Sequence, residues 1–245
     1  MNLLVDAGNT RVKWALARGG ALLDSGTFPH PETEAAVTAI LRNHRDIRRI
    51  ISANVAGPRF GDALDRTCRT TGLEVEWLRS GAFCCGVRNG YDTPAQLGSD
   101  RWAGMIGARA IVGSTCIVVT AGTATTIDLL DHDGSFVGGV ILPGYDLMRA
   151  SLAERTAQLP LASGHYQGRP RNTEDAIISG CLRAQAGAVT MMHRELGVPA
   201  APCILSGGAA DLLEPLLELP VRREDNLVLR GLAVIAAHHA RIDEE

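Results

Sequence analysis

The sequence contains almost no lysine. Arginine supplies 23 of its 24 basic residues, and the single lysine is Lys13. A genome rich in arginine codons would explain this ratio without any reference to function. The shortage still has a consequence, because a P-loop requires a lysine followed by serine or threonine, and Lys13 is followed by Trp14. A Walker-type nucleotide site is therefore excluded.

An excess of positive charge, long apolar runs and paired cysteines are also missing. The formal charge of −3 argues against a general binder of nucleic acid or of membrane surfaces. No stretch approaches the roughly 18 uninterrupted apolar residues of a membrane span, and a strand-like run stands where a basic signal peptide would lie. The six cysteines show no CxxC spacing and are typical of reduced thiols. We therefore expect a cytoplasmic protein without nucleic-acid or membrane partners.

What the chain does have is material for a core. Its 245 residues are 46% apolar, enough for one large domain or two small ones. Apolar periodicity and turn residues predict strands interspersed with helices, an α/β fold. The predicted strands cover residues 3–5, 12–16, 22–28, 49–55, 75–78, 116–119, 125–130, 136–142 and 203–205. The predicted helices cover residues 32–44, 58–71, 145–157, 173–196, 209–217 and 226–240, with one more beginning near Ser99.

The opening of the chain recurs 114 residues later. A buried strand leads into Asp6-Ala7-Gly8-Asn9-Thr10, and a second leads into Thr120-Ala121-Gly122-Thr123-Ala124. Two Ala-Gly turns can resemble one another by chance. The alternative is a chain of two related α/β halves, residues 1–114 and 115–245, whose glycine turns converge on a shared ligand-binding cleft.

An Asp-x-Gly-x-Thr turn after a buried strand suits phosphate binding. Backbone N–H groups of a tight turn can point at anionic oxygens, and a glycine lets phosphate approach closely. Thr10 adds a hydroxyl, Lys13 adds a positive charge, and Asp6 offers a carboxylate for Mg²⁺, directly or through water. With the second turn and Ser206-Gly207-Gly208-Ala209, the pattern indicates the actin, hexokinase and Hsp70 superfamily.

A second constellation runs from Tyr91 to Arg101. Pro94 and Gly98 mark a loop, and Ser99 is a good N-cap for the helix that follows. Asp100 in the first helical turn would complement the helix dipole in any protein. The adjacent Arg101 favours a second interpretation, in which the carboxylate takes a proton from a hydroxyl while the guanidinium holds a carboxylated substrate.

These motifs resemble type III pantothenate kinase, a family that includes the Bvg accessory factor proteins, over essentially the whole chain. The matching stretches, in order, are Asp6-Ala7-Gly8-Asn9-Thr10, Tyr91-x-x-Pro94-x-x-Leu97-Gly98-x-Asp100-Arg101, Gly122-Thr123-Ala124-x-Thr126-x-Asp128, Gly138-Gly139-x-Ile141-x-Pro143-Gly144, Thr156-Ala157-x-Leu159-Pro160 and Asn172-Thr173.

The resemblance implies two RNase H-like halves with a central cleft, and transfer of the ATP γ-phosphoryl group to pantothenate in the first step of coenzyme A synthesis. The first half would hold a phosphate loop, the substrate loop and the catalytic base Asp100. The second half would hold another phosphate loop, the adenosine region and the dimer helices. Pantothenate contacts are implied for Tyr91, Gly98, Ser99, Asp100, Arg101 and Thr173. ATP contacts are implied for Asp6, Ala7, Gly8, Asn9, Thr10, Arg11, Val12, Lys13 and Thr123.

Two further implications concern subunits and cations. In the family, the residue matching Thr173 reaches the pantothenate site of the partner in a homodimer. The family usually has an aspartate that binds K⁺ or NH₄⁺ where this chain has Thr120, so the monovalent-cation site is in doubt unless another carboxylate such as Asp128 fills the gap.

Two alternative functions are compatible with the same motifs. One is a nucleotide-binding accessory protein without kinase activity, and the other is a kinase for another small hydroxy acid or sugar. Asp6, Asp100 and Arg101 favour a kinase. Cys84-Cys85 has no evident base and is expected in a strand, and His238-His239 lacks zinc-site spacing and is expected to be solvated.

Overall fold

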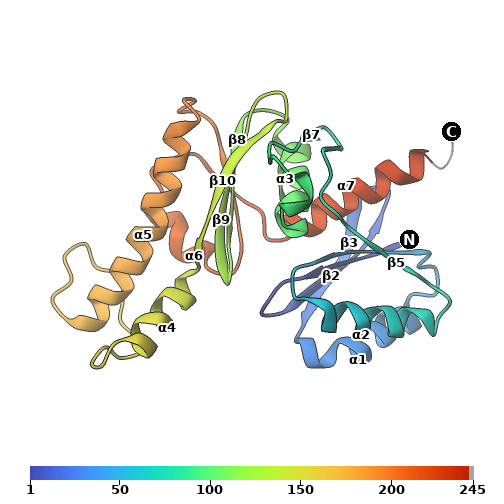
Figure 1. Cartoon of the computed structure of the whole chain (residues 1–245), viewed down its shortest axis with the longest axis horizontal. Coiled ribbons are helices and arrows are strands. Elements are labelled where there is room, and N and C mark those ends of the chain that lie inside the picture. The colour runs from blue at the N-terminus through green and yellow to red at the C-terminus, as the bar shows by residue number, and fades with distance from the viewer. Residues whose placement is uncertain (243–245) are drawn as a thin grey trace. The chain divides into compact units, whose positions relative to one another are not determined.

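The computed structural model describes residues 1–242, so the last three residues of the predicted second half lie outside it (Figure 1). The chain forms two compact units. Among the described residues, the first contains residues 1–113, 133–136 and 226–242, and the second contains residues 114–132 and 137–225. None of the helices among the described residues has the length and apolar character needed to cross a bilayer.

The first unit is built on a five-stranded sheet in the order β3-β2-β1-β4-β5. The central strand β1 pairs antiparallel with β2 and parallel with β4. The strands are β1 (Asn2–Ala7), β2 (Val12–Arg18), β3 (Ala21–Phe28), β4 (Arg49–Asn54) and β5 (Val75–Trp77). The predicted strands are confirmed here, and the predicted first hairpin is formed with Ala7 opposite Val12.

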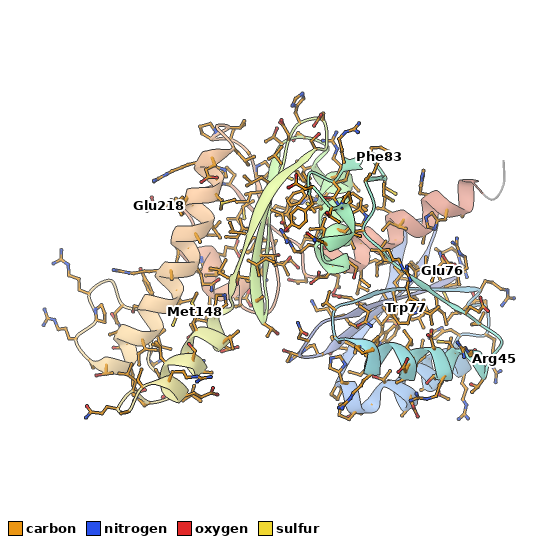
Figure 2. All side chains as sticks on the ribbon, in the orientation of Figure 1. Arg45, Glu76, Trp77, Phe83, Met148 and Glu218 are labelled. Atoms are coloured by element: carbon orange, nitrogen blue, oxygen red, sulfur yellow. The ribbon has the colours of Figure 1, made fainter. Side chains whose placement is uncertain are left out.

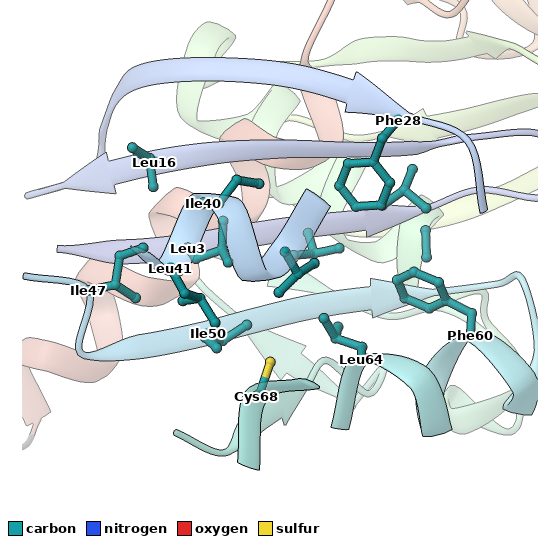
Figure 3. Close-up of a cluster of buried hydrophobic side chains, with 14 residues drawn as sticks. Leu3, Leu16, Phe28, Ile40, Leu41, Ile47, Ile50, Phe60, Leu64 and Cys68 are labelled. Atoms are coloured by element: carbon teal, nitrogen blue, oxygen red, sulfur yellow. The ribbon is translucent and has the colours of Figure 1, made fainter. Parts of the chain in front are cut away.

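Both faces of this sheet are buried, because successive apolar side chains of β1 point to opposite faces and each face packs against helices. Leu3 and Val5 point into a cluster with α1 (Thr33–Asn43) and α2 (Pro58–Arg69), drawn in Figure 3. Leu4 points to the opposite face, where it packs with residues of α3 (Ser99–Val112) and α7 (Leu227–Ile242). Successive strand residues face opposite sides, so a strand between two helical layers must be apolar throughout.

Helices α3 and α7 approach each other through glycine. A Cβ on Gly107 would lie 2.6 Å from the Leu227 carbonyl oxygen, and one on Gly231 would overlap the Ala103 carbonyl oxygen. Helix α3 carries the predicted catalytic residue in its first turn. This close backbone contact with α7 therefore fixes the helix that positions the site.

The second unit repeats the sheet order of the first. Its sheet runs β10-β9-β8-β11-β12, with β8 antiparallel to β9 and parallel to β11. The strands are β8 (Cys116–Ala121), β9 (Ala124–Leu130), β10 (Phe136–Pro143), β11 (Cys203–Ser206) and β12 (Val221–Arg223). In both sheets the central strand is six residues long and ends on the alanine of an Ala-Gly turn. The structure thus confirms two related α/β halves rather than a chance likeness of turns.

The helices of the second unit are α4 (Tyr145–Arg155), α5 (Thr173–Glu195) and the short α6 (Ala210–Leu213). In Figure 1, α4 lies along the lower part of α5. The helix predicted over residues 209–217 is wrong in its second half. Pro215 has no N–H for an α-helical hydrogen bond, and the chain continues as a 3₁₀ turn, Glu214–Leu216.

Candidate active site

The β1–β2 turn brings opposite charges together. Asp6, the last residue but one of β1, lies directly opposite Lys13 of β2, and the loop that joins the two strands includes the exposed residues Asn9, Thr10 and Arg11. The loop is held from outside by His30, whose Nε2 lies 2.8 Å from the Gly8 carbonyl oxygen. His30 was not among the predicted site residues, because it is 22 residues from Gly8 along the chain and belongs to no motif.

Asp6 lies in the electrostatic field of Asp100. Burial, with the negative charge of Asp100, raises the pKa of Asp6 from 3.8 to about 7, while Lys13 acts in the opposite direction. A carboxyl with so raised a pKa lacks sufficient positive charge nearby. The Asp6 carboxylate offers negatively charged oxygen atoms, which are the ligands that Mg²⁺ prefers. Asp6 therefore fits the predicted role of a magnesium ligand.

Asp100 is held in place by its neighbours at the start of α3. Its Oδ1 accepts a hydrogen bond of 2.8 Å from the backbone N–H of Arg101. A Cβ on Gly98 would stand 2.7 Å from the same oxygen, so this carboxylate position requires glycine there. The predicted N-cap is shifted by one residue: Ser99 is already helical and Gly98 is the cap, without a side-chain hydrogen bond.

Arg101 is buried beside two aromatic rings that are themselves neighbours, with the Tyr91 and Phe136 centroids 5.4 Å apart. Its guanidinium carbon lies 5.6 Å from the Tyr91 ring centroid and 5.7 Å from that of Phe136. Its Nη1 donates a hydrogen bond of 2.8 Å to the Tyr91 hydroxyl. Only 7% of Arg101 is exposed, so its charge is fixed in direction. The sequence predicted Tyr91 and Arg101 as members of one loop, whereas Phe136, the first residue of β10, was not among the predicted site residues.

The loop between Tyr91 and Asp100 is braced by Asn89. The Asn89 amide donates to the carbonyl oxygens of Gly81 and Pro94 over 3.1 Å each, and its Oδ1 accepts from the Tyr91 N–H over 3.0 Å. Asn89 is buried. The Asn89 side chain thus links Tyr91 and Pro94 of this loop to Gly81 in the preceding segment.

In the second unit, the turn at Gly122 is hydrogen-bonded to two other segments of backbone, one at Gly144 and one at Ala209. Gly144 donates from its N–H to the Thr123 carbonyl oxygen over 2.9 Å, and Ala209 donates to the Ala121 carbonyl oxygen over 3.0 Å. A Cβ on Gly144 or on Gly207 would overlap the backbone of this turn. Gly122 and Thr123 remain exposed. The three small-residue segments predicted to act together therefore include two, around residues 122 and 207, that are in direct contact.

Thr120 stands in a row of hydroxyl residues. It is opposite Thr126 in β9 and Ser206 in β11. Asp128 is two residues beyond Thr126, so its side chain points to the same face of the sheet. Asp128 is only 1% exposed. Position 120 is therefore neutral, and the buried Asp128 carboxyl lies on the same face of the sheet.

Thr173 begins α5, as predicted. Asn172 caps this helix by accepting from the Asp175 N–H over 2.8 Å. Thr173 is exposed and lines an apolar groove of about 560 Å³ between α4 and α5, whose wall includes Met148, labelled in Figure 2. Small residues on α5, Ala176, Gly180 and Ala184, form the floor of this groove.

Two other predictions need correction. Cys84 lies in a short strand, β6 (Phe83–Cys84), but Cys85 lies in the following turn with a φ of 49°. His238 is exposed as expected, whereas His239 is half-buried, with Nδ1 at 3.4 Å from Nη2 of Arg49. Arg49 in turn forms a two-point ion pair with Glu76, labelled in Figure 2.

The fold is shared with solved structures of the actin, hexokinase and Hsp70 superfamily. An activator of 2-hydroxyisocaproyl-CoA dehydratase from Clostridium difficile, solved with bound ADPNP, matches with a TM-score of 0.62 and 13% identity. The match covers 99% of this chain and 96% of that one. A glucokinase from an Antarctic psychrotroph matches with a TM-score of 0.52 and 14% identity, over 97% and 98% of the two chains. At these identities the likeness shows the fold alone.

The comparison with sequences is more specific. A type III pantothenate kinase of Aromatoleum aromaticum is 54% identical over 98% of this chain and 99% of its own. One from Azoarcus sp. strain BH72 is 51% identical over 98% of this chain and 92% of its own. The family model described as type III pantothenate kinase matches residues 2–195. The chain therefore belongs to the type III pantothenate kinase family.

Proposed function

We propose that this protein transfers the γ-phosphoryl group of ATP to the primary hydroxyl of pantothenate, giving 4'-phosphopantothenate and ADP in the first step of coenzyme A synthesis. Family membership supports this reaction. The observation that carries it is the charge arrangement of the first unit, where Asp6 interacts with Asp100 and Lys13 and where Arg101 is held against the neighbouring rings of Tyr91 and Phe136.

In this proposal Asp100 is the general base. The hydroxyl proton of pantothenate passes to the Asp100 carboxylate as the new O–P bond forms, and the bond between the γ-phosphorus and the ADP oxygen breaks. Arg101 binds the pantothenate carboxylate, with Tyr91, Gly98 and Ser99 around the substrate. A guanidinium whose position is fixed by a hydrogen bond and by aromatic contacts suits two-point recognition of a carboxylate.

ATP would be bound by residues 6–13 and by Thr123. The turn N–H groups, the Thr10 hydroxyl and Lys13 are donors suited to phosphate oxygens. Asp6 would hold Mg²⁺, directly or through water, and the ion when bound neutralises charge on the phosphates. Little covalent chemistry is required of the protein in such a reaction, so positioning and charge neutralisation carry most of the catalysis.

We further propose a cytoplasmic homodimer with shared active sites. The apolar groove between α4 and α5 supports this, because its small-residue floor would accept a helix of a second copy and because Thr173 stands at its edge. For the monovalent cation, the neutral Thr120 supports a weaker dependence on K⁺ or NH₄⁺ than the family pattern.

A coupled assay of ADP release separates this function from its rivals. Pantothenate should stimulate ADP release well above the rate with ATP alone, whereas glucose and glycerol should not. ADP release with a sugar or glycerol but not with pantothenate would indicate a different kinase. No stimulation by any of them, with ATP still bound, would indicate the accessory protein.

A further inference from the structure

Two neighbouring cysteines form a tight hairpin before the substrate loop. Strand β6 (Phe83–Cys84) pairs with β7 (Val87–Arg88), and Cys85 and Gly86 make the turn. Cys85 has a φ of 49° and Gly86 a φ of 80°. Among the described residues Cys85 is the one non-glycine residue with positive φ. Left-handed backbone is costly for a side-chain-bearing residue, so the turn is conformationally specific.

This turn brings the two sulfur atoms together. Consecutive residues of an extended strand point to opposite faces, whereas the Sγ atoms of Cys84 and Cys85 are 3.5 Å apart. A disulfide needs about 2.05 Å, so the turn would have to change to form one. A single atom bonded to both sulfurs at about 2.3 Å would subtend an angle of about 100°, which needs no change in the sulfur positions.

The electrostatics of the two thiols also favour binding of a soft metal or metalloid atom, called a soft centre below. The hydrogen bond between the two thiols lowers the pKa of Cys84 to about 7, although partial burial acts in the opposite direction. The thiolate is the form that binds soft metals and metalloids. Both cysteines are half-exposed, whereas the other four are buried: Cys68, Cys116, Cys181 and Cys203.

A cavity adjoins Cys84 and can receive an organic group. Its volume is about 240 Å³, and Trp77, Phe83 and Trp102 contribute aromatic walls. Trp77 and Phe83 are labelled in Figure 2. An apolar cavity of about 150 Å³ is enough to hold benzene, so one aromatic ring fits here.

The number of ligands decides which soft centre fits. Structural zinc takes four protein ligands. Within residues 1–242, the one group of three or more clustered metal-binding side chains is Asp131, His132 and Asp133, which does not include the cysteines. The pair therefore suits a centre that needs two protein ligands and carries an organic substituent of its own.

We propose that Cys84 and Cys85 form a chelating site for monosubstituted trivalent arsenic, with the substituent in the neighbouring aromatic cavity. In binding an organoarsenic oxide, two S–H bonds break and two As–S bonds form, and the arsenic oxygen leaves with both protons as one water molecule. Arsenic stays trivalent, so no oxidant or reductant is required.

Intact-mass spectrometry with phenylarsine oxide tests the site. The wild-type protein should gain one phenylarsenic group that persists in millimolar glutathione and is removed by 2,3-dimercaptopropanol. From Cys84→Ser and from Cys85→Ser the group should be lost to glutathione at least about 100-fold faster, because a chelate is lost. Cys181→Ser should behave as the wild type.

Peptide mapping of the wild-type adduct makes the test independent of how the variants fold. The arsenic should be found on the tryptic peptide of residues 80–88, which contains both cysteines. No glutathione-resistant adduct on the wild type, an adduct on another peptide, or equal retention by a Cys84→Ser/Cys85→Ser double variant would each overturn the proposal. Replacing phenylarsine oxide with Cd²⁺ gives a further arm: tight binding of Cd²⁺ that excludes the arsenical would overturn the preference for a two-ligand centre.

Discussion

Arg101 donates a hydrogen bond from Nη1 to the hydroxyl of Tyr91 across 2.8 Å, with its guanidinium carbon 5.6 Å from the same ring's centroid. One side chain thus fixes Arg101 in two ways, by a directed hydrogen bond and by a cation–π contact. Phe136 lies next to the Tyr91 ring and makes a second cation–π contact with Arg101 at 5.7 Å. Because a buried arginine that cannot rotate loses little entropy on binding an anion, we expect these contacts to contribute to substrate affinity.

The first prediction concerns that hydrogen bond. Tyr91→Phe keeps the ring and removes the hydroxyl, so Arg101 keeps its stack and loses one acceptor. Because the guanidinium donor is charged, this hydrogen bond contributes about 1.5–3 kcal/mol, so KM for pantothenate should rise about tenfold or more while KM for ATP stays unchanged. Steady-state kinetics with either substrate varied measures both. Tyr166→Phe, in the second unit beside Arg183, is the matched control. Equal KM values for Tyr91→Phe and wild type would show that the hydroxyl does not position Arg101.

The second prediction is a pH dependence of stability. The pKa of Asp6 is raised to about 7 in the folded protein, so between about pH 4 and 7 the folded state keeps a proton that the unfolded state releases. The free energy of unfolding should therefore fall as the pH rises through this window. Asp6→Asn removes the ionisation, and the variant should be about 1–3 kcal/mol more stable than wild type at about pH 8 and similar to it near pH 4.

Urea unfolding of the ligand-free protein at several pH values measures this difference. Asp24→Asn, an exposed position in β3, controls for the loss of a carboxylate as such. Parallel curves for wild type and Asp6→Asn over the whole pH range would contradict the assigned electrostatics.

The third prediction concerns the monovalent cation. Thr120 offers neutral oxygen atoms where relatives have a carboxylate, so K⁺ should be bound more weakly and needed less. Asp128, on the same face of the sheet, is the nearby carboxyl that would compensate. We expect kcat/KM to change little when K⁺ or NH₄⁺ is replaced by a bulky organic cation at constant ionic strength. Thr120→Asp should acquire a dependence. A strong requirement in wild type that is the same in Thr120→Asp would exclude this account.

The fourth prediction tests whether two subunits share a site. Asp100→Asn and a bulky substitution, Thr173→Trp, should each inactivate the protein. Mixed dimers should recover activity, because one of the two sites then combines the intact Asp100 of the Thr173→Trp chain with the intact Thr173 of the Asp100→Asn chain. Differently tagged chains, co-expressed and purified through both tags, supply the mixed dimer. An isolated mixed dimer without activity would exclude sharing between subunits.

The site was predictable from sequence where its residues are close together along the chain. The turn after Ala7, the loop from Tyr91 to Arg101 and the helix start at Thr173 all depend on local patterns of glycine, proline and capping residues. The contact of His30 with the Gly8 carbonyl and the stacking of Phe136 on Arg101 depend on which segments the folded chain brings together. No local pattern encodes such contacts.

Two local errors have local causes. Pro215 ended a helix that apolar spacing had extended, because periodicity does not register a missing N–H. At the start of α3 the cap is Gly98 and Ser99 is already helical, because the helix begins one residue earlier than the capping preference of serine indicated. The sequence also placed both Cys84 and Cys85 in a strand, because nothing in it indicated the left-handed turn at Cys85.

The role of Asp100 is the central claim, and transfer of labelled phosphate tests it most directly. With [γ-³²P]ATP and pantothenate, the wild-type protein should form labelled 4'-phosphopantothenate. Asp100→Asn should lower kcat by about 10²–10⁴-fold while ATP affinity and the thermal transition stay close to wild type, because general-base assistance is lost. Asp92→Asn, exposed on the same loop, should retain full activity. The account would be contradicted if the wild type formed no labelled 4'-phosphopantothenate, or if Asp100→Asn kept a kcat close to that of the wild type.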